Sequence, residues 1–402
     1  MPNSPAANQA FGPRFVFSLA LALFGTSMLD VLSSLFLVDL ATAFLGDSSR
    51  ISISIVSQIV TISSIFAIVF GILNGFLSVK VKHKTLLLFG ALCIVIGTVG
   101  CLLAPNLLFL QIFYPFDGIG TIIVSSMCFT IIGETLPLER RAKTIGIVTS
   151  TGIISLAIGF ALAGVFANNG GYRSYLTWYV LPIALIAVLC AYFVIPKGLP
   201  QVTAVKQSFS NSFEEVLLRK TALACLIGNI FLSAGGMWSF FAATFWRQKF
   251  LLPVEFVAAI TVAVVSVYAL GGLLGGRLID RLGRKRFVVA SWFTRGVLIV
   301  SIVFMPEVWS ALLMSFIATF IGGFSVTGGH TLLLEQAPKS RGTIMSVGGV
   351  FSSIGVSLGV AIGGLALIAG YESLGLILGL LTITASLIIL FLAKEPCKTI
   401  EK

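Results

Sequence analysis

Two carboxylates stand inside long apolar stretches of this 402-residue chain. Asp30 lies about 15 residues into the stretch 15–37, and Asp117 lies about ten residues into the stretch 107–133. An ionisable group near the centre of a membrane span costs about 2.5–3.5 kcal/mol on insertion scales, so each is a candidate functional residue. Because a buried carboxylate can take up and release a proton, the chemistry predicted for both is proton coupling. The alternative is a structural acid bonded to neighbours such as Tyr114.

The apolar stretches that hold these acids recur along the whole chain. The sequence is 57% hydrophobic and 10% charged, with a mean hydropathy of +1.06. A membrane-spanning helix needs about 20 apolar residues. Backbone groups in lipid must be satisfied within the segment, which favours helices over strands. We therefore predict an all-α membrane protein with twelve transmembrane helices, near residues 15–37, 51–77, 85–104, 107–133, 144–167, 174–195, 221–246, 255–275, 287–305, 308–334, 343–369 and 372–393.

The formal net charge of +11 follows the predicted topology. Of the 26 Lys and Arg residues, 21 fall on one side of the alternating spans, four on the other, and Arg295 inside a span. Positive charge of this kind marks the cytoplasmic side, so both termini are predicted to be cytoplasmic. The expected neighbours of the basic loops are anionic membrane lipids and not nucleic acid. The short loops favour a multi-pass protein of the cell membrane.

The chain consists of two similar halves at a constant offset of 201 residues, which is half of its length. In a membrane protein such a repeat is typical of a protein that rocks one half against the other. Six identical pairs carry the repeat: Gly75 and Gly276, Lys84 and Lys285, Pro105 and Pro306, Glu134 and Glu335, Pro137 and Pro338, Arg140 and Arg341.

A charged loop in the second half carries a recognisable signature. Residues 276–285 read GRLIDRLGRK, in which Gly276 lets one helix approach another closely and Gly283 permits a left-handed turn. Asp280 is the one acid among these cations. The loop resembles the signature G-x-L-x-D-R-x-G-R-K of the major facilitator superfamily at every fixed position. The resemblance extends to the E-x-x-P…R element after spans 4 and 10 and covers essentially the whole chain.

The resemblance implies two six-helix bundles and alternating access to a central cavity lined by spans 1, 4, 7 and 10, usually coupled to a proton or another ion. We expect one bundle over residues 1–195 and another over 221–402. The cytoplasmic linker 196–220 is expected to hold an amphipathic helix, with a capping box from Ser212 to Glu215. The residues expected to form a conformational latch are Gly75, Gly276, Asp280, Arg281, Gly283, Arg284, Lys285, Glu134, Arg141, Glu335 and Arg341.

The first half departs from the family pattern. Val79 and Lys82 replace the acid and the second glycine of the loop signature. Tyr114 stands where the family often has an arginine, and Gly159 lacks the following proline found in many antiporters. We therefore expect ion coupling in the first bundle and the intact latch, at Asp280, in the second.

Span 7 contains paired glycines and aromatic residues that could stack on a substrate. Arg295 is interpreted as a structural ion pair or as a side chain reaching toward the cytoplasm, because the family places span 9 at the periphery. His330 is interpreted as a packing histidine, with proton relay as the alternative. The expected residues of the substrate cavity are Tyr114, Asn229, Trp238, Ser239, Phe241 and Thr327.

Several classes of chemistry lack their motifs. The chain has no phosphate-binding loop for ATP, no H-x-x-x-H and no C-x-x-C, so we expect no enzyme, no cofactor and no metal. The expected function is secondary active transport of a small molecule by alternating access, as proton-coupled efflux of an apolar or cationic compound by antiport. Symport or uniport uptake of a small metabolite is the alternative. A non-transporting sensor and a polytopic lipid enzyme rank lower. We expect a monomer.

Overall fold

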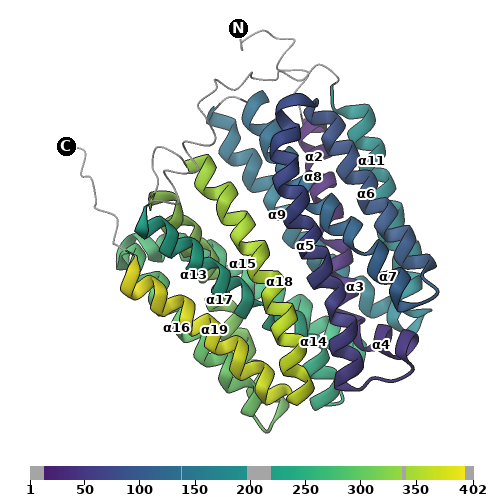
Figure 1. The fold of residues 1–402 in the computed structure, drawn as a ribbon, viewed down its shortest axis with the longest axis vertical. Coiled ribbons are helices and arrows are strands. Elements are labelled where there is room, and N and C mark those ends of the chain that lie inside the picture. Colours follow the sequence, from purple (N-terminus) through teal and green to yellow (C-terminus); the bar gives the residue numbers. More distant parts are fainter. Residues whose placement is uncertain (1–12, 137, 197–218, 337–340, 394–402) are drawn as a thin grey trace. The chain divides into compact units, whose positions relative to one another are not determined.

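The computed structural model describes residues 13–136, 138–196, 219–336 and 341–393. In these residues the secondary structure is helical throughout (Figure 1). In the first half of the chain the helices are α2 (Pro13–Thr26), α3 (Met28–Leu35), α4 (Leu37–Leu45), α5 (Arg50–Lys80), α6 (His83–Leu103), α7 (Leu107–Phe113), α8 (Pro115–Thr135), α9 (Leu138–Asn168), α10 (Gly171–Tyr175), the π-helix η1 (Leu176–Val180) and α11 (Leu181–Val194).

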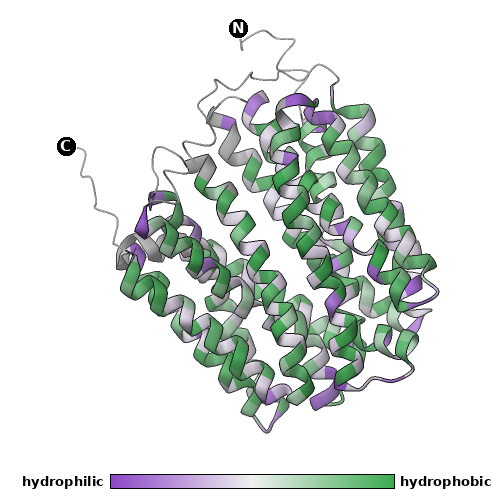
Figure 2. Cartoon of the chain, in the orientation of Figure 1, coloured by the Kyte–Doolittle hydropathy of each residue, from purple (hydrophilic) through white to green (hydrophobic). Residues whose placement is uncertain are grey.

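In the second half they are α13 (Lys220–Gly236), α14 (Trp238–Lys249), α15 (Val254–Leu282), α16 (Arg284–Phe304), α17 (Val308–Gln336), α18 (Arg341–Ala369) and α19 (Tyr371–Leu392). Within the described residues, twelve helical segments are long and apolar enough to cross a membrane. Hydrophobic residues cover most of their length (Figure 2). The predicted all-α fold with twelve transmembrane helices is therefore confirmed.

Contacts divide the chain into two compact units. The first comprises Met1–Ser52, Ile62–Ala204 and Leu252–Val262, and the second comprises Ile53–Thr61, Val205–Leu251 and Ala263–Lys402. In the first unit α2 packs on α8, α9 and α11, and α6 packs on α8. In the second unit α16 packs on α17 and α19, and α13 packs on α18 and α19. The predicted bundle boundaries at residues 195 and 221 stay a prediction, and the predicted linker helix lies outside the described residues.

Three spans are interrupted in their interior. Span 1 breaks at Ser27 and Phe36, span 4 at Tyr114, and span 7 at Met237. In span 4 the cause is Pro115, which has no N–H to donate and whose ring crowds the preceding turn. There the N–H of Asp117 bonds to the carbonyl of Tyr114 at 3.0 Å, a tighter turn than an α-helix makes. The breaks set Asp30 and Asp117 in the first turns of new helices, α3 and α8.

Glycines let the helices of the second unit approach one another closely. A Cβ atom on Gly235 of α13 would lie 2.5 Å from the carbonyl oxygen of Leu378 and 2.9 Å from the amide nitrogen of Thr382, both in α19. On the adjacent Gly236, a Cβ atom would meet nothing closer than 3.8 Å, the distance to Nη2 of Arg295. The two glycines therefore differ in role: Gly235 allows helix contact, and Gly236 borders free space.

This difference predicts opposite outcomes for two neighbouring substitutions. Gly235→Ala should lower the free energy of unfolding by about 1–3 kcal/mol, because the backbone of α19 must move. Gly236→Ala should change it by less than about 0.5 kcal/mol, since its methyl group makes an ordinary contact. Thermal unfolding of both purified variants in one detergent tests this. Equal unfolding temperatures would contradict the packing described for α13 and α19.

Candidate functional site

Asp30 and Asp117, nearly 90 residues apart in sequence, come together within the first unit. Their carboxylates interact electrostatically with each other, and both interact with the phenol of Tyr114. Each acid stands in the first turn of its helix, where the helix dipole favours negative charge. We call Asp30, Tyr114 and Asp117 the acid cluster.

The two acids differ in their surroundings. Asp117 is only 4% exposed, and its Oδ1 atom has no hydrogen-bond donor among the described residues. Asp30 is exposed, and it interacts with Asp117, Tyr114 and Tyr175, which belong to other helices of the unit. Asp117 is thus buried by protein, whereas Asp30 is accessible.

Tyr114 of span 4 links Asp117's helix to span 1. Its side chain is 2% exposed, and its hydroxyl group hydrogen-bonds with Ser33. Ser33 in turn donates to the backbone carbonyl of Asp30 at 3.1 Å. The residue that replaces the family's arginine therefore supplies a neutral hydrogen-bonding group between two carboxylates.

Two tyrosines of span 6 complete the surroundings, and the sequence did not predict them. Tyr175 donates to the carbonyl of Met28 at 3.1 Å and interacts with Asp30. The hydroxyl group of Tyr179 is buried without a partner among the described residues. Both lie at the π-helix η1, a local distortion that is frequent at functional sites. Their spacing of four residues was a visible signal, but π-helical turns have no reliable sequence signature.

The arrangement suits the handling of one proton. Two carboxylates that interact in a low-dielectric interior repel each other when both are ionised, so a proton on either one relieves the repulsion. Asp30 is the exposed member of the pair in the described structure.

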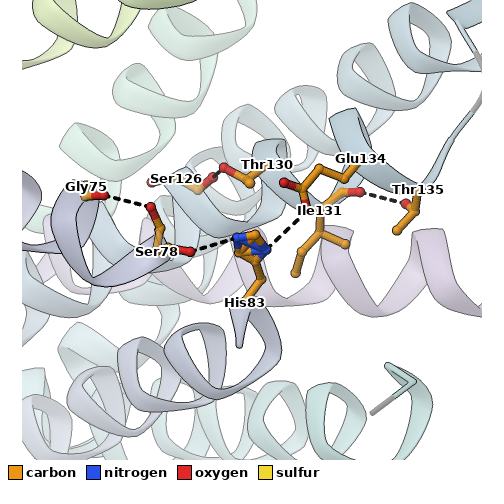
Figure 3. A network of polar contacts seen from close by, with 8 residues as sticks. All are labelled: Gly75, Ser78, His83, Ser126, Thr130, Ile131, Glu134 and Thr135. Atoms are coloured by element: carbon orange, nitrogen blue, oxygen red, sulfur yellow. Dashed lines mark hydrogen bonds and ion pairs between the residues drawn. The ribbon is translucent and has the colours of Figure 1, made fainter. Parts of the chain in front are cut away.

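A second polar cluster joins the predicted latch residue Glu134 to His83 (Figure 3). The Nδ1 atom of His83 lies 3.2 Å from Oε2 of Glu134, and its Nε2 atom lies 3.2 Å from the carbonyl oxygen of Ser78. Both neighbours only accept hydrogen bonds, and the contact with Glu134 is an ion pair only when His83 is in its imidazolium form. The distance to Glu134 is that of an ion pair, although the angle at Nδ1 is not that of a hydrogen bond.

The repeat places an equivalent ion pair in the second unit. His83 plus 201 is residue 284, Glu134 plus 201 is residue 335, and Arg284 forms an ion pair with Glu335. The pair in the first unit thus depends on a titratable histidine, whereas the pair in the second unit uses a permanently charged arginine.

The other predicted latch residues are described to different extents. Lys84, the counterpart in the repeat of the predicted latch residue Lys285, donates to the carbonyls of Tyr192 and Ile195 at the end of α11, the first at 2.6 Å, which compensates the helix dipole there. Gly283 has a φ of 84°, a conformation that favours glycine. Gly75 borders open space, so no close helix approach occurs at it. Only the helical backbone is described for Gly276, Asp280, Arg281, Arg141 and Arg341, and their predicted contacts stay predictions.

Most of the predicted cavity residues of the second unit are engaged in packing. Asn229 donates to the carbonyl of Gly348 at 3.1 Å, and Thr327 donates to the carbonyls of Gly272 and Gly323, each at 3.2 Å. Phe241 and Trp238 are buried, whereas Ser239 is exposed. A small pocket is lined by Asn229 and by His330, which is exposed.

Arg295 does not form the predicted ion pair with any carboxylate in the described part of the chain. Nor does it extend along its own helix toward a water surface. Its guanidinium group lies against Gly322 of α17, and its Nη2 atom points toward Gly236 of α13. The prediction assumed that Arg295 interacts at the periphery, because span 9 was expected there. An arginine side chain is long enough to contact neighbouring helices instead.

The two ion pairs of the repeat predict coupled substitutions at equivalent positions. In a double-mutant cycle, His83→Gln and Glu134→Gln should show a coupling free energy on the order of 1 kcal/mol. His83→Arg, which places the cation of the second unit in the first, should keep the coupling. The measurement is thermal unfolding of the detergent-purified variants.

The matched control is the cycle of Arg284→Gln and Glu335→Gln. It should show coupling of at least the same size, because a guanidinium group matches a carboxylate in two hydrogen bonds. Fully additive effects of His83→Gln and Glu134→Gln would contradict an ion pair between the two residues.

Comparisons with known proteins agree with this architecture. The family profile described as Major Facilitator Superfamily matches residues 15–253 and 225–401. The chain is 22% identical over 343 residues to the uncharacterized MFS-type transporter YceJ of Bacillus subtilis, covering 85% of this chain and 87% of that protein. It is 24% identical to the cis,cis-muconate transport protein of Acinetobacter baylyi, covering 66% of each.

Among solved structures, a D-xylose–proton symporter shares the fold with a TM-score of 0.80 at 15% identity, covering 95% of this chain and 98% of that one. Members of the matched family are transporters and not enzymes. Twelve apolar helices, two related halves, an acid cluster inside the spans and a family match over nearly the full length lead to one conclusion: the chain belongs to the major facilitator superfamily and is a multi-pass membrane protein that acts as a secondary transporter of small molecules.

Proposed function

We propose that this transporter is coupled to protons and that Asp30 and Asp117 share the coupling proton. The observation that carries the proposal is the acid cluster: an accessible carboxylate and a carboxylate that is 4% exposed interact with each other and with Tyr114. A proton gives this pair one negative charge instead of two. Its gain or loss therefore changes the local charge without any other ion.

The two ion pairs of the repeat suit a latch that accompanies such a cycle. His83–Glu134 and Arg284–Glu335 occupy equivalent positions at the ends of spans 3 and 9 and of spans 4 and 10. We propose that these ends, both termini and the loop around Asp280 face the cytoplasm and that the protein resides in the cell membrane as a monomer. The excess of Lys and Arg in these segments supports that orientation.

Two modes of transport are compatible with the acid cluster. Efflux of an apolar or cationic compound by proton antiport is supported by two acids in largely apolar surroundings, since a cation and a proton can compete for them. Symport uptake of a metabolite is supported by Arg295, a buried cation in the second unit that would repel a cationic substrate. The relative named as a cis,cis-muconate transport protein, whose substrate is a dicarboxylate, also favours the second mode.

Proton coupling is tested in vesicles that contain the purified protein and a trapped pH-sensitive dye. The probes are cis,cis-muconate and a lipophilic cationic dye, each added with and without an imposed pH gradient. We expect one probe to move protons in the wild type. Asp117→Asn and Asp30→Asn should lower this proton movement at least tenfold, because an amide cannot ionise. Tyr114→Phe should reduce it less.

Exchange of labelled for unlabelled probe, without a gradient, provides the control. Both Asn variants should retain exchange, which shows that they fold and bind. The matched substitution is Asp39→Asn, an acid of α4 outside the acid cluster, which should move protons as the wild type does. Normal proton movement in both Asp30→Asn and Asp117→Asn would refute the proposal.

A further inference from the structure

Arg295 is a charged side chain that the proton cycle does not use. It stands eleven residues after the start of α16 and nine before its end, close to the middle of span 9. Its side chain is only 9% exposed. In the described residues no carboxylate pairs with it, and the one electrostatic partner of its guanidinium group is the phenol of Tyr268.

The guanidinium group lies where two other helices lack side chains. A Cβ atom on Gly322 of α17 would be 3.3 Å from Cζ and Nε of Arg295, and a Cβ atom on Gly236 would be 3.8 Å from Nη2. Tyr268 of α15 and Gly236 are half-buried and not sealed. All four residues belong to the second unit, and each lies near the middle of its span.

A helix break lies beside this guanidinium group. α13 ends at Gly236, and α14 begins at Trp238 without a side-chain cap. The last carbonyls of α13 carry partial negative charge and the first N–H groups of α14 carry partial positive charge, so the break itself adds no net positive potential. Arg295, nine-tenths buried and directed toward Gly236, brings a full positive charge to the same place.

A purely structural role does not explain this arrangement. A cation removed from water loses hydration, and the loss is offset only when an anion or several acceptors surround it. No salt bridge to a described acid compensates the charge of Arg295, because Glu335, the acid of span 10, is paired with Arg284. In a membrane protein an uncompensated charge at mid-span indicates a site for a substrate or ion.

We propose that Arg295, with Tyr268, is the anchor for a carboxylate group of the transported substrate, so that the substrate class is a small organic anion. The guanidinium fork matches a carboxylate in two parallel hydrogen bonds. The Tyr268 hydroxyl group can donate a third. The proposal rests on transport by this chain as proposed above, and it selects the anionic substrate over the apolar or cationic one.

The test is equilibrium binding to the detergent-purified full chain, without a proton gradient. The probes are benzoate, benzamide and benzylamine, which share one size and differ in charge, together with succinate and cis,cis-muconate. We expect at least one carboxylate to bind, and benzoate to bind more tightly than benzamide or benzylamine. Arg295→Gln should weaken carboxylate binding at least tenfold, and Arg295→Lys should weaken it less, because the charge remains but the fork is lost.

Gly322→Ala serves as a variant that keeps Arg295. Its methyl group would press on the guanidinium group, so carboxylate affinity should fall several-fold while the unfolding temperature stays close to that of the wild type. The matched control is Arg286→Gln, which removes an exposed cation from the same helix and should bind as the wild type does.

Three results would overturn the proposal. These are failure of every carboxylate to bind the wild type, tighter binding of benzylamine than of benzoate, and wild-type carboxylate affinity in Arg295→Gln. In the last case a lower unfolding temperature would assign Arg295 a structural role. Failure of proton coupling is a separate result, because it appears in the vesicle assay of Asp30 and Asp117 and leaves these binding constants unchanged.

Discussion

A charge inside a membrane span must find its partner within the protein, because hydrocarbon offers neither water nor counterions. The structure solves this differently in its two units. In the first, two carboxylates and Tyr114 gather at the start of two helices, where the helix dipoles favour them. In the second, the cation Arg295 lies beside two glycines and pairs with no acid in the part of the chain that the structure describes. Within the first unit these groups constrain spans 1 and 4, and within the second unit they constrain spans 7, 9 and 10.

Interrupted helices make that placement possible. An uninterrupted helix of 29 residues would keep all its backbone groups paired and offer no helix ends at mid-span. The breaks at Ser27, Tyr114 and Met237 create new first turns in the interior of spans 1, 4 and 7. Span 6 is also irregular, because it contains the π-helix η1. Tyr175, directly before η1, donates to the carbonyl of Met28. In these spans the irregular helix turns and the polar side chains thus occur at the same places.

The repeat shows how the two units have diverged. Both keep an ion pair at the same offset, but histidine carries the positive charge in one and arginine in the other. The two carboxylates of the acid cluster lie in the first unit, and the buried Arg295 lies in the second. Because the two kinds of charge sit in different units, a proton and an anion need not compete for one group. This division fits a cycle in which each unit handles one of the two.

The sequence by itself determined the twelve helices, the twofold repeat, the family and the two acids, since these follow from hydropathy and from residue spacing along one chain. The break before Asp117 also has a local cause in the sequence, since Pro115 removes a backbone donor wherever it stands. Only the tertiary structure decided what the polar groups contact. Asp30 meets Asp117, His83 meets Glu134, and Arg295 reaches Gly322, in each case across helices. Thr327 and Asn229, predicted for a cavity, bond to backbone carbonyls of neighbouring helices. Such contacts depend on helix rotation and on the reach of long side chains, which the order of residues does not encode locally.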